Sequence, residues 1–279
     1  MNSQELTQGL IGFGLVLLLL VGCGGAPVAS TSIPSTPTPS KPELPKGPGS
    51  EWNLVVVGDS SLWGLGEALA SQIENDVGVK VVLDDFAIAT LSAGQVLQVL
   101  QTGETHDFQL RKLPAALQDA EFIVIFVNPY DSVDPEKPLN FDGCFSASAP
   151  SSCNPTSLEK WTTDLKAIWA EIFKLRNGLP TILRATDIYN PLVSSWNEYD
   201  IFAACTGCWE NMSYAARLAA EAYNIPFLSR YDAFNGMDHM EDPIEKGYIN
   251  ADGEHPSDLM NQFTAELLSR MGYEPVSQP

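Results

Sequence analysis

Residues 53–61 read Asn-Leu-Val-Val-Val-Gly-Asp-Ser-Ser, an apolar run that stops at a glycine and a polar turn. β-Branched residues favour strands, so we expect a buried strand from Asn53 to Val57. Gly58 permits a tight turn, and Ser60 would then lie at the carboxyl end of that strand, a few residues before a helix. A hydroxyl there faces a cleft and lies near backbone N–H groups that can stabilise an oxyanion. Gly-Asp-Ser is equally typical of an ordinary turn, so by itself this stretch is a weak indication of catalysis.

Outward from this stretch, apolar runs alternate with helical patterns along the rest of the chain. Further strands are expected at residues 79–83, 122–127, 181–184 and 226–229, and helices at residues 65–74, 93–101, 113–119, 157–175, 210–223 and 259–271. This alternation predicts an α/β fold in which helices cover both faces of a parallel sheet. We expect a flavodoxin-like, three-layer α/β/α sandwich with about five parallel strands. Ligands of such sheets bind beyond the carboxyl ends of the strands.

A serine needs a base before it can act as a nucleophile, and the chain has three histidines. His106 and His239 lie among acidic neighbours and are typical of solvated loop residues. His255 follows Asp252 by three residues, in a turn ahead of the last expected helix. This spacing lets the carboxylate bind one ring nitrogen while the other nitrogen faces the cleft. The pattern is also typical of helix-capping loops, so only its combination with Ser60 suggests a catalytic triad.

The third expected strand ends at the same edge of the sheet as Ser60. Its apolar run, Phe122 to Val127, leads into Asn128 and Pro129. The amide of Asn128 could donate to the oxyanion of a tetrahedral intermediate, although Asn-Pro is also a common turn. Three candidate residues therefore converge on one edge of the sheet.

In their order along the chain these residues resemble the sequence blocks of the SGNH (GDSL-type) hydrolases, over residues 52–272. The blocks are Gly58 to Ser60, Asp85 to Ser92, Asn128, and Asp252-x-x-His255-Pro256. The resemblance implies a serine hydrolase that cleaves an ester through an acyl-enzyme, without a cofactor. It implies that Ser60 is the nucleophile, His255 the base and Asp252 the residue that orients the base. The oxyanion hole would be formed by the N–H groups of Ser60 and Thr90 and the side chain of Asn128.

Two residues depart from the family pattern. Thr90 stands where the second block usually has glycine, and Phe126 replaces the glycine that usually lies two residues before Asn128. A threonine keeps the N–H donor in place only if the turn does not require a positive φ. A non-catalytic ligand-binding lipoprotein of the same fold, and an acyltransferase, are therefore alternatives to the esterase. The substrate could be an ester of a lipid, a glycan or a small molecule.

Composition limits the classes of partner. The 279 residues include 44% hydrophobic residues, enough to bury a core, and carry a formal charge of −20. Because such an acidic chain repels polyanions at long range, we expect no nucleic-acid partner. We also expect a monomer with no bound metal.

The first fifty residues predict export. Residues 10–22 are apolar or glycine throughout, the length of the apolar region of a signal peptide and too short for a transmembrane helix. They lead into Leu20-Val21-Gly22-Cys23, which resembles a bacterial lipobox with Cys23 as the lipid attachment site. We expect a signal peptide over residues 1–23, a Pro/Ser/Thr-rich linker over residues 24–50 and a hydrolase domain over residues 51–279.

This arrangement predicts an exported lipoprotein, anchored on the outer face of the cytoplasmic membrane or in the cell envelope. Residues 1–9 contain no Lys or Arg, which is unusual for an export signal. An uncleaved membrane anchor and a plain secretory signal are therefore the alternatives.

Four cysteines remain beside Cys23, and exported thiols tend to oxidise, so two disulfides are expected. The most local pairing joins Cys144 with Cys153 and Cys205 with Cys208. Two alternatives are a redox pair at Cys205 and Cys208, just before a helix, and a zinc site formed by all four residues.

Several aromatic residues in or beside expected loops are candidates for binding a sugar or an acyl chain: Trp63, Tyr130, Trp196, Tyr199 and Trp209. For each of them a place in the core or at the rim of the site is the simpler expectation. The long segment from Tyr130 to Pro155 is expected to overhang the cleft as a lid or wall.

Overall fold

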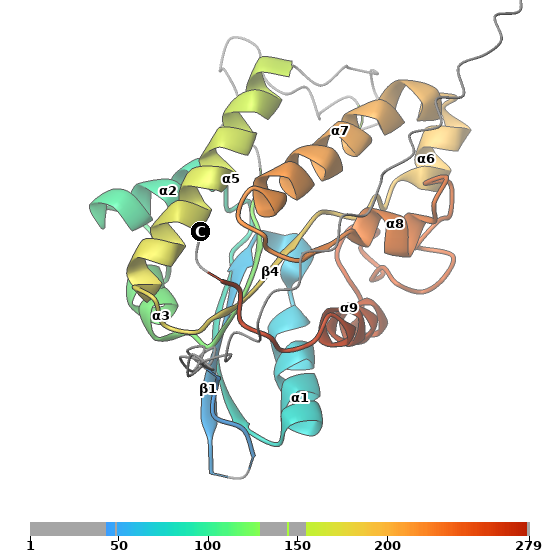
Figure 1. Cartoon of the computed structure of the whole chain (residues 1–279). Helices are drawn as coiled ribbons and strands as arrows, with labels where there is room; N and C mark the ends of the chain where they lie inside the picture. The colour runs from blue at the N-terminus through green and yellow to red at the C-terminus, as the bar shows by residue number, and fades with distance from the viewer. Residues whose placement is uncertain (1–42, 48, 129–143, 145–154, 278–279) are drawn as a thin grey trace, which may run out of the picture. The chain divides into compact units, whose positions relative to one another are not determined.

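The computed structural model describes residues 43–47, 49–128, 144 and 155–277, which belong to one folded unit (Figure 1). Cys23, Tyr130 and Cys153 lie outside these residues, as do the expected signal peptide and most of the expected linker and lid. At the end of the expected linker, Leu44 is buried in the core, and the Trp52 indole N–H donates to the carbonyl oxygen of Pro45 at 2.7 Å. The last residues before the first strand therefore pack on the domain.

Five parallel strands form the central sheet, in the order β2-β1-β3-β4-β5. The strands are β1 (Glu51–Gly58), β2 (Lys80–Ala87), β3 (Phe122–Phe126), β4 (Ile182–Thr186) and β5 (Phe227–Leu228). Every residue of β3 and β4 is buried, because both faces of a parallel sheet are covered by helices. The α/β fold with a five-stranded parallel sheet is thus confirmed.

Helices lie on both sides of this sheet (Figure 1). On one side α1 (Leu65–Val77) packs against α9 (Asp258–Arg270). On the other side α5 (Pro155–Arg176) packs against α2 (Ala93–Thr102), α3 (Leu113–Asp119) and α7 (Phe202–Glu221). Two short helices, α6 (Val193–Glu198) and α8 (Arg230–Asn235), and two 3-10 turns, η1 (Ser60–Leu62) and η2 (Leu110–Lys112), complete these elements. The sequence patterns predict neither short helix.

Local side chains fix the ends of several helices. Ser92 caps α2, because its hydroxyl accepts the Gln95 N–H while the Gln95 side chain accepts the Ser92 N–H. Ser257 caps α9 by accepting the N–H of Met260. Gly78 ends α1 in the left-handed conformation, at φ 75°.

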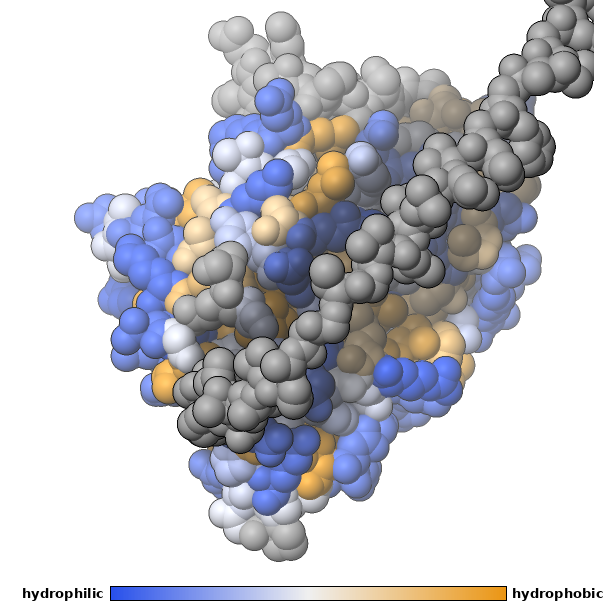
Figure 2. All heavy atoms as spheres, in the orientation of Figure 1, coloured by the Kyte–Doolittle hydropathy of each residue, from blue (hydrophilic) through white to orange (hydrophobic). Residues whose placement is uncertain are grey.

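Hydrophilic residues cover much of the face of the domain seen in Figure 1, and apolar residues lie between them in separate patches (Figure 2). No helix among the described residues combines the length and the apolar character that a membrane span requires.

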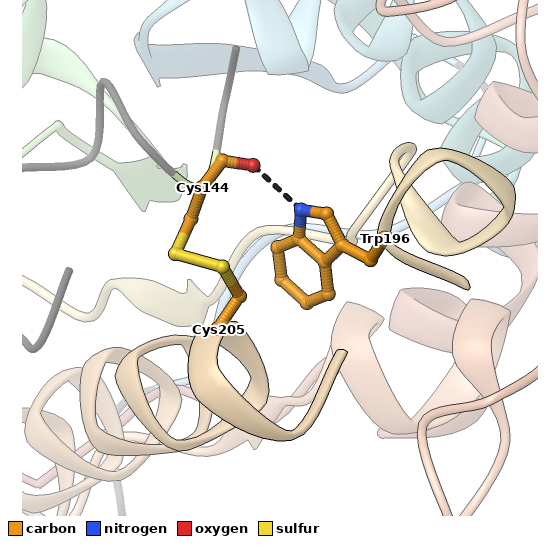
Figure 3. Close-up of a disulfide and its surroundings, with 3 residues drawn as sticks. All are labelled: Cys144, Trp196 and Cys205. Atoms are coloured by element: carbon orange, nitrogen blue, oxygen red, sulfur yellow. Dashed lines mark hydrogen bonds between the residues drawn. A yellow bond between two sulfur atoms is a disulfide. The ribbon is translucent and has the colours of Figure 1, made fainter. Parts of the chain in front are cut away.

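The local disulfide pairing expected from the sequence is wrong. Cys144 is bonded to Cys205, with their Cα atoms 5.5 Å apart, and the Trp196 indole N–H donates to the Cys144 carbonyl oxygen at 2.6 Å (Figure 3). The reason is that α7 begins at Phe202, well before the expected start at Glu210, so Cys205 and Cys208 lie inside a helix. Side chains three residues apart share one helix face, and both can therefore bond to segments packed on that face.

Cys208 is disulfide-bonded as well. The alternative of a Cys205–Cys208 redox pair therefore fails. In the described part of the chain, no group of three or more His, Cys, Asp or Glu side chains could hold a metal ion.

Candidate active site

The strand order reverses between β1 and β3, which are neighbours although β2 lies between them in sequence. In open parallel sheets the crevice for ligands opens at such a reversal, beyond the carboxyl ends of the two strands. Ser60 follows β1 and Asn128 follows β3, so both residues lie at this crevice.

Ser60 begins the 3-10 turn η1, directly after β1. The side chain of Asp59 caps the turn by accepting the Ser61 N–H at 2.9 Å. Gly58 is required for close packing, since a Cβ atom there would lie 2.3 Å from the Phe126 carbonyl oxygen and 2.4 Å from Leu62 Cδ1. The Gly-Asp-Ser sequence therefore combines a close strand contact, a cap and an accessible hydroxyl.

Asp59 also positions Asn128, another candidate donor of the oxyanion hole. The Asn128 side-chain amide donates to Asp59 Oδ2 at 3.0 Å, and both residues are buried. The backbone of Asn128 accepts from Ala93 N–H at 2.9 Å and donates to the Leu91 carbonyl at 3.1 Å. Asn128 thus links the turn η1, which contains Ser60, to the segment that contains Thr90.

Thr90 adopts a left-handed backbone conformation, at φ 60°. The turn therefore has the conformation that favours glycine, although a β-branched residue occupies it. Thr90 is exposed and lines the same cavity as Ser60 and Asn128. Thr90 adopts the glycine-like conformation itself, at a cost in backbone strain, so its N–H keeps the direction that a glycine there would give it, contrary to the condition inferred from the sequence.

His255 and Asp252 form a pair in the loop before α9. His255 Nδ1 lies 3.0 Å from Asp252 Oδ2, and Asp252 Oδ1 accepts the backbone N–H groups of Glu254 and His255 at 2.9 and 3.0 Å. These backbone hydrogen bonds, with that to the imidazole, lower the pKa of Asp252 to about 2. Asp252 is therefore a carboxylate at neutral pH, and its bond to Nδ1 leaves Nε2 as the nitrogen that can accept a proton.

The structure brings most of these residues around one cavity of about 90 Å³. Its lining residues are Asp59, Ser60, Ser61, Thr90, Asn128, Ile188, Tyr189, Pro191, Glu254 and His255. No hydrogen bond between Ser60 and His255 is present among the described residues. Such contacts commonly tighten only when substrate is bound.

The other two histidines lie elsewhere. His239 stacks on Tyr231 with ring centroids 3.8 Å apart, and its Nε2 lies 2.9 Å from Asp232 Oδ1. His106 lines a separate surface hollow beside α2. His255 is therefore the histidine that shares a cavity with Ser60.

The sequence patterns did not identify Arg230, which is buried beneath the turn η1. Its guanidinium donates to the Ser61 carbonyl oxygen at 2.7 Å, to Ser61 Oγ at 3.1 Å and to the Asp187 carbonyl oxygen at 2.7 Å. It also lies 5.7 Å from the centre of the Phe126 ring, so this phenylalanine packs against a cation. Burial lowers the pKa of Arg230, yet the group stays a cation at neutral pH.

Asp187 completes this buried network. Its carboxylate accepts the N–H groups of Arg230 and Tyr231 and the hydroxyls of Ser213 and Ser229. Burial raises the pKa of Asp187, and these hydrogen bonds oppose the rise. Because Asp187 directly follows β4, the strand-edge argument that finds Ser60 and Asn128 could also have found it.

The aromatic candidates separate into three groups. Trp196 and Trp209 are fully buried and pack edge to face, 5.5 Å between ring centroids, so they belong to the core. Tyr199 is exposed, at 59%, and does not line the cavity. Trp63 stacks on His255.

No protein-family model matches the sequence, and a search of curated proteins finds no match. Solved structures do match the fold. A lipase from a goat rumen metagenome is 18% identical, with 80% of this chain and 98% of that chain covered and a TM-score of 0.58. A catalytic mutant of an acetylxylan esterase from Geobacillus stearothermophilus is 14% identical, with 84% and 99% covered and a TM-score of 0.53. These likenesses confirm the predicted fold, a parallel sheet covered by helices on both faces.

Proposed function

We propose that the protein is a carboxylic ester hydrolase of the SGNH type, with Ser60 as nucleophile. The observation that carries the proposal is the convergence of four separate segments on one cavity at the strand reversal. They contribute Ser60, Thr90, Asn128 and His255. An accessible hydroxyl, a carboxylate-bound imidazole and an amide around one cavity are the groups that acyl transfer needs.

In the proposed reaction Ser60 Oγ attacks the ester carbonyl carbon while its proton passes to Nε2 of His255. Asp252 keeps the Nδ1–H hydrogen-bonded and stabilises the imidazolium. The imidazolium then protonates the departing alkoxide, which leaves as the alcohol. Water gives a proton to the same imidazole as it attacks the carbonyl carbon of the acyl-Ser60. The imidazolium then returns this proton to Ser60 Oγ as the bond between Oγ and the acyl group breaks and the carboxylic acid is released.

The oxyanion of both tetrahedral intermediates would be stabilised by the N–H groups of Ser60 and Thr90 and by the Asn128 amide. Asp59 supports this role, because its bond to the Asn128 side chain fixes the orientation of the amide. Asn128→Ala is expected to lower kcat by about 10²-fold.

The proposed substrates are esters of a small molecule, a glycan or a lipid, and the preferred acyl length is the quantity that the experiment below measures.

A chromogenic ester series of increasing acyl length, together with acetylated glycans, tests the proposal. With the ester that gives the highest kcat/KM, we expect a loss of about 10³-fold or more in Ser60→Ala and in His255→Ala. Transfer of the acyl group to an added alcohol in preference to water would make the protein an acyltransferase. Tight binding of a glycan or lipid without turnover would favour the non-catalytic alternative.

We further propose that the hydrolase is exported and anchored through a lipid on Cys23. The support is the sequence alone, namely the apolar residues 10–22 and the lipobox-like Leu20 to Cys23. A single acyl chain binds membranes only marginally, so two or more chains are expected. Cys23→Ala should release the protein from membranes, whereas an equally membrane-bound variant with an intact N-terminus would indicate an uncleaved anchor.

A further inference from the structure

Trp63 is three residues beyond Ser60, and its indole lies flat against the imidazole of His255. The ring centroids are 4.6 Å apart and the planes are inclined by 21°. The side chain is still 42% exposed, so only one face of the indole is used for this contact. Trp63 is therefore not a core aromatic, and its inner face is not open to a sugar or an acyl chain.

Two hydrogen bonds hold Trp63 in this position. Its indole Nε1–H donates to the Ala87 carbonyl oxygen at the end of β2, at 2.9 Å. Its own carbonyl oxygen accepts from Asn261 Nδ2 in α9, at 2.8 Å. The next residue, Gly64, has a φ of 79°, and a Cβ atom there would lie 2.6 Å from the same Asn261 nitrogen. β2 thus holds the indole of Trp63, and α9 holds its backbone.

The contact complements the bond between His255 and Asp252. Asp252 restrains the imidazole in its own plane through Nδ1, whereas the indole restrains it from one face. An aromatic face attracts a cation, tryptophan most strongly, so the contact favours the imidazolium that forms during acyl transfer. The other titratable groups that face His255 are Asp252 and Glu254 on its own loop and Asp59 and Tyr189 across the cavity. Among the described residues, Trp63 is the aromatic residue whose ring stacks on His255.

We propose that Trp63 is a positioning residue for the catalytic base: it fixes the plane of the His255 imidazole and stabilises its protonated form. The inference rests on the proposed function, in which His255 is the base. It assigns to Trp63 a role that acts through His255 and requires no contact with substrate.

Proton NMR titration of the full-length protein tests the inference directly. The chain has three histidines, so His106→Gln and His239→Gln spectra identify the signals of His255. The variants to compare are Trp63→Leu, which removes the aromatic face, Trp63→Phe, which keeps a face, and Phe108→Leu, which removes an exposed aromatic outside the cavity.

In Trp63→Leu the ring protons of His255 should lose the change in NMR chemical shift that the ring current of the indole causes. Their titration midpoint should fall by about 0.3 to 1 pH unit, the size of one cation–aromatic contact. Trp63→Phe should retain part of both effects, and Phe108→Leu should change neither. With an ester substrate, kcat of Trp63→Leu should fall by about 3- to 30-fold with little change in KM, and the acid limb of the rate profile should move to lower pH.

An unchanged ring-proton shift and midpoint in Trp63→Leu would overturn the inference. A rise in KM with unchanged kcat and an unchanged His255 titration would also overturn it, since that result would assign Trp63 to substrate binding. The NMR result does not require turnover, so it separates failure of this inference from failure of the proposed esterase activity.

Discussion

The two halves of the candidate site are built in different ways. The half that contains Ser60, called the nucleophile half after its proposed role, is positioned by Asp59, which is 4% exposed and accepts hydrogen bonds from Ser61 and Asn128. Arg230 is buried beneath it and donates to the Ser61 carbonyl oxygen. The half that contains His255, called the base half, is positioned by Asp252, whose side chain is 48% exposed. The hydrogen bonds of Asp252 are local, to Glu254 and His255 in the same loop.

This difference separates stability from rate. Long-range contacts that position Ser60 are also contacts of the core, so their loss should lower the free energy of unfolding. The loop that positions His255 is fixed from outside by the Tyr189 hydroxyl, which donates to the Glu254 carbonyl oxygen at 2.9 Å, and by Trp63. Substitutions in that loop should lower the rate and leave the fold intact.

The largest effect is expected for Asp252→Asn. The asparagine amide would face Nδ1 with N–H groups and favour the wrong imidazole tautomer, so kcat should fall by about 10³- to 10⁴-fold. The free energy of unfolding, measured by urea titration, should change by less than about 1 kcal/mol, because the carboxylate is largely exposed.

Glu245→Gln, an exposed charge in the preceding loop, is the matched control and should affect neither quantity. A marked loss of stability in Asp252→Asn would show that the base loop contributes to the fold, and the contrast between the halves would then be wrong.

The next largest effect is expected for Arg230→Met. It leaves the carbonyl oxygen of Ser61 buried without a donor, at about 1–3 kcal/mol, and it removes the cation beside the buried Asp187 carboxylate. Urea unfolding should therefore show a loss of about 2–5 kcal/mol. Arg217→Met is the control, because the ion pair of Arg217 with Asp232 is partly exposed and 3.5 Å long and should contribute less than about 1 kcal/mol. Equal losses in both variants would contradict a special role for the buried network.

The pattern of successes along the sequence has a physical cause. β1, β3, α1 and α3 follow from apolar periodicity, and β1 and α1 also from the glycines at their ends, Gly58 and Gly78, which are local properties. α8 was missed because its six residues carry no periodic pattern, and its first N–H groups are capped by Asp187, 43 residues away. Arg230 was missed for the same reason.

The cysteine pairing was predicted wrongly because it depends on tertiary contacts, and the positive φ of Thr90 could not be predicted from its residue type. Cys205 is 61 residues from Cys144, and no spacing rule identifies such a partner. Threonine disfavours the left-handed region, so the residue type at position 90 gives no sign of its conformation. That Ser60, Asn128 and His255 share one cavity could be predicted, because the ends of parallel strands and the loop before the last helix meet at one edge.

A smaller effect is expected for Thr90→Gly, which sharpens the description of the nucleophile half. The left-handed conformation costs a side-chain-bearing residue about 1–2 kcal/mol, and glycine loses about 0.5–1 kcal/mol more in backbone entropy on folding. The variant should therefore gain up to about 1 kcal/mol in the free energy of unfolding and retain activity. Ala89→Gly, at a neighbouring residue without a positive φ, should lose stability instead. If both glycine variants were destabilised alike, the strain at Thr90 would be refuted.

The smallest effect concerns pH. The lowered pKa of Asp252 means that its interaction with His255 is present above the ordinary pKa of an aspartate and is lost only as pH falls towards about 2. Between about pH 4 and pH 6, Asp252 should therefore add no proton dependence, and the slope of log kcat/KM against pH should not exceed about one. A slope of two in this range, in protein that circular dichroism shows to be folded, would mean that Asp252 titrates there too.

The most direct measurement of the central claim is covalent labelling by a serine-directed phosphonate, read by peptide mass spectrometry. The account predicts one adduct per chain, on Ser60, formed by the wild type and by Asn128→Ala at a lower rate. His255→Ala should label at least about 10²-fold more slowly. Absence of label on wild-type protein, or label on any residue other than Ser60, would contradict the assignment of Ser60 as an activated nucleophile.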